Sequence, residues 1–79
     1  MMASAIVLIA AKNGRAKEVE SKLMKMQNVR RIENVRGEYD LIAEIDAKNE
    51  IKLENIMHEN IMKLKNVDFV SPLIKKYHE

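Results

Sequence analysis

The chain has 79 residues, 33% of them charged, a formal net charge of +2 and no cysteine. This length corresponds to one domain, whose hydrophobic core supplies only about 3–5 kcal/mol of net stability by itself. The lack of cysteine excludes disulfide bonds and thiolate metal sites, and two histidines are too few for a structural zinc site. We therefore expect a single domain over residues 1–79, with no metal and no cofactor, that is stabilised by association between subunits.

The first half of the chain predicts a strand, a helix and a second strand. Residues 3–11 are an apolar, β-branched run followed by polar turn residues, which is typical of a buried strand. From Arg15 the apolar residues recur at helical spacing, with Asn13 as the candidate N-cap and Asn28 as the candidate left-handed residue at the end. Residues 29–36 alternate weakly, which suits an exposed edge strand that carries a bulge.

The second half repeats this order after a turn. Residues 39–46 alternate between two faces with strand periodicity, and this places Tyr39 on the same face as the apolar residues of that strand. Asn49 is the candidate cap of a second helix, and Asn66 is its candidate stop. The apolar stripe of this helix consists of Leu53, Ile56, Met57, Ile61 and Leu64. Residues 67–76 form the last strand, where a proline favours an edge position because it cannot donate a ladder hydrogen bond.

This element order predicts an α+β, ferredoxin-like βαββαβ fold. Two right-handed crossovers joined by a hairpin give a four-stranded antiparallel sheet with strands one and three in the centre and both helices on one face. The opposite face should be polar in a monomer. Instead the first strand is apolar on both sides, and the last strand divides into two apolar sets. The first set is Val67, Phe69 and Leu73, and the second is Val70, Pro72 and Ile74.

An apolar helix-free face predicts a homodimer formed by sheet-to-sheet packing, a dimeric α/β barrel. Covering four or five large apolar side chains at roughly 1.5–3 kcal/mol each recovers about 10 kcal/mol. The cost of association is about 4–15 kcal/mol, so the two quantities are comparable. The alternative is a monomer with an unusually apolar sheet, although large exposed apolar patches are uncommon on soluble monomers.

The segment Gly37-Glu38-Tyr39-Asp40, followed by two apolar residues, lies at the predicted hairpin, and an Asn-Val step follows each predicted helix. With the opening apolar strand, this pattern resembles the ligand-binding and oligomerisation domain of the Lrp/AsnC transcriptional regulators over essentially the whole chain. The resemblance implies homodimers assembled into rings of four or five dimers, with small effectors, often amino acids, bound between dimers. Taken alone, the four-residue segment also fits an ordinary hairpin turn with acidic residues.

The same resemblance implies the residues of an effector site. Gly37, Glu38, Tyr39 and Asp40 match the family hairpin beside the effector pocket: Asp40 would bind an ammonium group, Tyr39 would form a wall, and Gly37 would allow close approach. In the last strand, amino-acid-binding members commonly carry threonines at the positions where this chain has Val70 and Pro72, and here only Ser71 offers a hydroxyl.

The chain begins directly at the first predicted strand, so it resembles the stand-alone members of the family, which lack a helix-turn-helix domain. We expect it to act by assembling with full-length regulators. Direct contact with nucleic acid is not expected, because the basic residues are interleaved with acidic ones and lack aromatic neighbours. The longest apolar stretch is far shorter than the roughly 20 residues that span a bilayer, and no signal-peptide pattern is visible, so a cytoplasmic protein without a membrane partner is predicted.

An enzyme is the alternative from another class. The same fold, paired through its sheets, hosts small cofactor-free monooxygenases and isomerases. In that case Tyr39, Asp40 and His58 are the residues that would have to converge in a pocket. The sequence shows no Ser/His/Asp or Cys/His set and no glycine-rich phosphate loop, so it predicts a protein that is not an enzyme.

Overall fold

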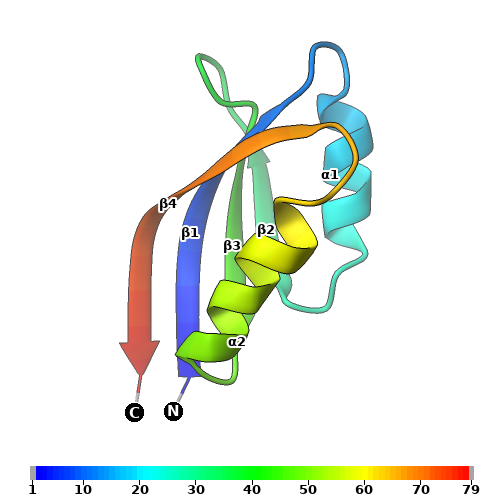
Figure 1. The fold of residues 1–79 in the computed structure, drawn as a ribbon. Helices are drawn as coiled ribbons and strands as arrows, with labels where there is room; N and C mark the ends of the chain where they lie inside the picture. The colour runs from blue at the N-terminus through cyan, green and yellow to red at the C-terminus, as the bar shows by residue number, and fades with distance from the viewer. Residues whose placement is uncertain (1, 79) are drawn as a thin grey trace.

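A four-stranded antiparallel sheet carries two helical segments on one of its faces (Figure 1). The computed structural model describes residues 2–78. The elements are β1 (Met2–Ala11), α1 (Ala16–Met24), β2 (Val29–Asn34), β3 (Leu41–Ala47), α2 (Glu50–Asn55), the π-helix η1 (Ile56–Ile61) and β4 (Val67–His78). The strand order is β2-β3-β1-β4, so the predicted ferredoxin-like class, with the first and third strands in the centre, is confirmed.

The hydrophobic core lies between the sheet and the helices. Every second residue of β3, from Leu41 to Ala47, is buried, and β1 shows the same alternation from Ala3 to Ile9. The helices contribute five side chains to this layer: Val19, Leu23, Leu53, Met57 and Ile61. Because side chains alternate along a strand, the residues between the buried ones point to the other face of the sheet, which we call the helix-free face.

The second helical segment changes from an α-helix to a π-helix at Ile56. Its fully buried residues, Leu53, Met57 and Ile61, recur every four positions. In a regular α-helix of 3.6 residues per turn, each such step rotates the side chain by about 40° away from the preceding one. The π-helix holds more residues per turn, as the hydrogen bond from the Met62 N–H to the Met57 carbonyl shows (2.9 Å), and it keeps these side chains on the sheet.

The predicted signals at the helix ends are right for the second helix and wrong for the first. The Asn49 side-chain oxygen accepts a hydrogen bond from the Lys52 N–H (2.8 Å), and Asn66 has a positive φ of 73°. The first helix begins after Arg15 without a side-chain cap, so Asn13 does not cap it. It ends at Met24, before Asn28, whose side-chain amide instead donates to the Asp46 carbonyl (2.8 Å).

Two register shifts in β4 overturn the predicted division of this strand into faces. Ala10 pairs with Phe69 and Ala11 with Val67, so one extra residue separates the two pairs. Val67 is therefore buried in the core, whereas Phe69 lies on the helix-free face. A second shift lies between the pairs of Ile6 and Val7; the side chain of Ile74, which was also placed by simple alternation, is outside the described part of the structure.

Replacement of the Asn49 cap should destabilise the domain. Asn49→Ala removes the acceptor for the Lys52 N–H, and the loss of such a cap costs about 1 kcal/mol. Urea unfolding followed by circular dichroism measures this change. Asn60→Ala, at an exposed position of η1, is the matched control and should change stability by less than about 0.5 kcal/mol. Equal effects of the two variants would contradict the role of the cap.

Candidate functional site

The connection between β2 and β3 is fastened to the end of β1 by Asp40. The Val35 N–H donates to the Asp40 carbonyl (2.9 Å), and the Asp40 N–H donates to the Ile9 carbonyl (2.9 Å). One carboxylate oxygen of Asp40, Oδ2, accepts a hydrogen bond from the Ala11 N–H (2.7 Å). Figure 1 shows this connection at the end of the sheet where β1 finishes. Asp40 therefore has a structural role that its sequence pattern did not indicate.

Gly37 has a φ of 119°, a conformation that residues with a side chain rarely adopt. A Cβ atom added to Gly37 would have no described heavy atom within 4 Å. Glycine is thus required here by the backbone conformation rather than by crowding. The neighbouring Glu38 is exposed, so both residues are open to solvent at the tip of the connection.

The ring of Tyr39 packs edge-on against Phe69, with 5.5 Å between ring centroids and an interplanar angle of 76°. Because β3 begins only at Leu41, Tyr39 is not part of the strand, and the prediction that it shares a face with the buried residues of β3 is wrong. Ser71, opposite Leu8, lies two residues beyond Phe69 on the same side of β4. The structure thus joins the hairpin to the helix-free face through Phe69, which sequence reasoning missed as a site residue.

The helix-free face has an apolar half beside this hairpin. Ile6 and Leu8 of β1 and Ile42 of β3 are half-buried, and Phe69 is 50% exposed. Their cross-strand neighbours complete a continuous layer, because Leu8 pairs with both Ile42 and Ser71. These side chains are already partly covered within one chain, so the free energy available from covering them is smaller than the sequence suggested.

The other half of the helix-free face is charged. Arg30 forms an ion pair with Asp46 (3.0 Å), and Arg31 forms one with Glu33 (2.9 Å). The two arginines lie on β2, and Asp46 lies on β3. These two strands and the neighbouring positions of β1 and β4 enclose shallow hollows. A hollow of about 370 Å³ is lined by Met2, Ala3, Ser4, Arg30, Glu44, Asp46 and Lys76. Within residues 2–78, no group of three or more histidine and carboxylate side chains is arranged to hold a metal ion.

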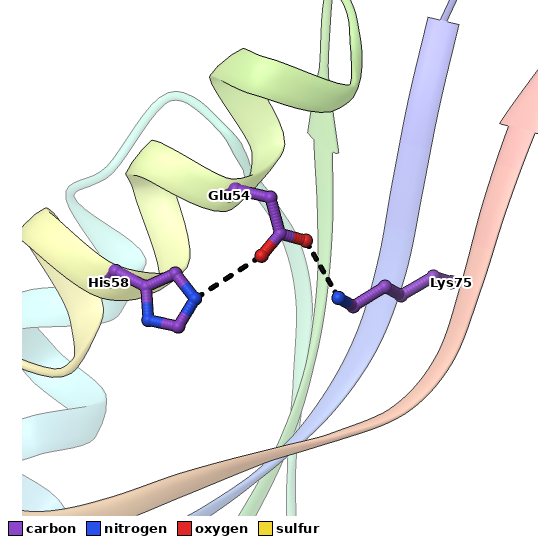
Figure 2. Close-up of polar contacts among 3 residues, drawn as sticks. All are labelled: Glu54, His58 and Lys75. Carbon is purple, nitrogen blue, oxygen red and sulfur yellow. Dashed lines mark hydrogen bonds and ion pairs between the residues drawn. The ribbon is translucent and has the colours of Figure 1, made fainter.

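A separate polar cluster joins the second helix to β4 on the helix-covered side (Figure 2). Lys75 Nζ donates to Glu54 Oε2 (2.7 Å), and His58 Nε2 lies 3.2 Å from Glu54 Oε1. The hydrogen bond from Lys75 lowers the pKa of Glu54 from its ordinary value of 4.5, although partial burial opposes this effect. His58 is thus engaged with Glu54, and the structure does not bring it together with Tyr39 and Asp40.

These observations define a small ferredoxin-like domain with an uncovered sheet face that ends at an aromatic contact with a hairpin. The Lrp/AsnC ligand-binding domain model matches residues 4–74, and the chain belongs to this family. The family consists of transcriptional regulators, so the prediction that the chain is not an enzyme is confirmed. Neither helical segment between residues 2 and 78 is long and apolar enough to cross a membrane.

Several known proteins are similar to this chain. The HTH-type transcriptional regulator FL11 of Pyrococcus furiosus is 36% identical over 53 residues, which is 67% of this chain and 35% of that protein. The chain thus spans about a third of the length of this curated relative. The structure of FFRP-DM1 has a TM-score of 0.85 at 29% identity, with 92% of this chain and 96% of that chain covered.

Two further solved structures share the fold. The hypothetical protein PHS023 from Pyrococcus horikoshii has a TM-score of 0.87 at 28% identity and covers 100% of this chain and 93% of that chain. Escherichia coli AsnC has a TM-score of 0.86 at 13% identity, a likeness of fold alone, with 98% of this chain and 52% of that chain covered.

Removal of the Asp40 carboxylate should destabilise the hairpin. Asp40→Ala leaves the Ala11 N–H without its acceptor, at a cost of about 1–3 kcal/mol. Asp40→Asn retains an acceptor oxygen and should cost less. Denaturant unfolding of both variants tests this order, with Glu38→Ala in the exposed tip as the control that should stay near the parent protein. A loss no larger for Asp40→Ala than for the control would show that the hydrogen bond is not important.

The Glu54 cluster should make stability depend on pH in one direction. Because the folded protein lowers the pKa of Glu54, the stabilisation is present above 4.5 and is lost as the pH falls through the folded-state pKa. Glu54→Gln should therefore reduce the free energy of unfolding at pH 7 by at most about 1 kcal/mol, as for other partly exposed ion pairs, and this reduction should shrink as the pH falls below 4.5. Glu38→Gln controls for the lost charge, and a difference that persists at low pH would refute the assignment.

Proposed function

We propose that this chain is an oligomeric effector-binding module that pairs with a second copy through the helix-free face and binds a small molecule beside residues 37–40. The observation that carries this proposal is the contact between Tyr39 and Phe69. It makes the apolar layer of the sheet continuous with the hairpin. An interface formed on this layer therefore ends beside Glu38 and Gly37. A ligand bound there would contact both subunits.

The uncovered face supports the homodimer. Phe69 is 50% exposed, and Ile6, Leu8 and Ile42 keep part of their surface in water. Covering such side chains is favourable in proportion to the apolar area removed from water, and a symmetric pair doubles the gain because each copy contributes the same patch. A face-to-face pair of this kind is the dimeric α/β barrel that the fold permits.

The hairpin supports a ligand site of defined chemistry. Asp40 Oδ2 is engaged by the Ala11 N–H, so an ammonium group of an effector would be recognised by Oδ1 and by the exposed Glu38. Tyr39 would form a wall, and Ser71 would offer a hydroxyl. An amino acid or a related small metabolite carries the matching ammonium group, and this class of effector is the one that we propose.

Two solved relatives are matched over nearly their whole chains. FFRP-DM1 and PHS023 are matched over 96% and 93% of their own chains, whereas the curated regulator is matched over 35% of its length. We propose that the dimers assemble further, into rings of four or five, and also with full-length regulators of the family. An effector bound at a subunit boundary would shift the balance among these assemblies by its differential affinity for them. No direct contact with nucleic acid is part of this proposal.

Native mass spectrometry tests the dimer and the ligand together. The protein should appear as dimers of its 9.2 kDa chain or as multiples of dimers, and a pool of amino acids should add the mass of a bound effector. Leu8→Glu introduces a charge at the centre of the apolar half and should weaken the dimer at least about 100-fold, because each copy would bury an unpaired carboxylate in the interface. Ile51→Glu, at a position 74% exposed on α2, is the matched control.

For the ligand, Asp40→Asn and Glu38→Gln should each weaken effector binding while the dimer persists. A monomer at micromolar concentration would contradict the proposed assembly. A dimer that binds no member of the pool, or binds it equally well in both hairpin variants, would contradict the proposed site.

A further inference from the structure

Two charged residues of the helix-free face have no ion-pair partner among residues 2–78. They are Glu44 on β3 and Lys76 on β4, whereas the arginines of the same face are each paired with a carboxylate. In the backbone register, Glu44 is opposite Ile6 and Lys76 is opposite Ser4. The two charges therefore stand on either side of β1, and with Ser4 they line a hollow of about 110 Å³.

A partner that covers this face removes water from both charges. An ionised group that loses water without a counter-charge is strongly destabilising, so an interface here must supply an opposite charge to each. A flat apolar partner would leave both unpaired. A partner that presents a cation near Glu44 and an anion near Lys76 would satisfy both.

A second copy of this chain can present this arrangement. Sheets that pack face to face align their strands within about 30°, with about 10 Å between them. If the two-fold axis of such a pair runs parallel to the strands and passes over β1, it exchanges the two sides of β1, so β3 of one copy faces β4 of the other. Glu44 and Lys76 differ by one register step of two residues along β1, a displacement that two long side chains can span. The contact occurs twice, because the interface is symmetric.

We infer that Glu44 of each copy forms an ion pair with Lys76 of the second copy, and that this pair of contacts selects which chains associate through the sheet. The inference rests on the sheet-to-sheet dimer proposed above. It adds the rule of partner choice: chains that keep an acid at the β3 position and a base at the β4 position associate, and chains with like charges at facing positions do not.

Charge reversal tests this rule. The E44K variant has two bases at these positions and the K76E variant has two acids, so each should form a homodimer at least about tenfold weaker than the parent protein. A mixture of E44K with K76E, one of them carrying a mass tag, should restore a heterodimer in native mass spectrometry. The double variant should form homodimers but should not mix with the parent chain. E50K, at an exposed position of α2, is the control for reversal elsewhere.

The outcomes separate this inference from the proposed function. A parent protein that is monomeric refutes both. A dimeric parent whose two single variants are equally dimeric overturns the ion pair and leaves the dimer in place. If the double variant is restored but the mixture of single variants is not, the pair forms within one chain, and the inference fails for that reason.

Discussion

The structure depends on one constraint: two helical segments cover only one side of a four-stranded sheet. The fully buried residues of β1 and β3 all point to that side, where Leu23, Leu53 and Ile61 meet them. The intervening positions include Leu8 and Ile42, which stay partly exposed. In so small a domain the covered side provides the core, and the uncovered side is the surface through which the proposed assembly would form.

The hairpin at residues 37–40 is held to this sheet by both backbone and side chain. A carboxylate oxygen of Asp40 accepts a hydrogen bond from the Ala11 N–H, at the point where the pairing of β1 with β4 shifts register. Tyr39 contacts Phe69 just beside it. A strand irregularity, a hydrogen bond and an aromatic contact thus fix the hairpin relative to the helix-free face, so that any ligand bound there would be sensitive to what covers the sheet.

Much of the fold could be predicted from local patterns, because each strand, helix and helix end is indicated by the residues of its own short stretch of sequence. Asn49 and Asn66 were assigned correctly for this reason. The faces of β4 were not, since alternation fails wherever a strand holds an extra residue, and only pairing with β1 reveals that Phe69 and Val67 lie on opposite sides. The structural role of Asp40 was likewise not predictable, because its partner is a backbone group 29 residues away.

The π-helix at Ile56–Ile61 also has a meaning for comparison between family members. A π-helical turn holds one residue more than the α-helical turn that would connect the same two ends of this segment. Relatives that are one residue shorter in this segment would form an ordinary helix and still bury the equivalents of Met57 and Ile61. Gaps in alignments should therefore fall within this turn rather than at the loops on either side, and a single-residue deletion here would be accommodated more easily than one in α1.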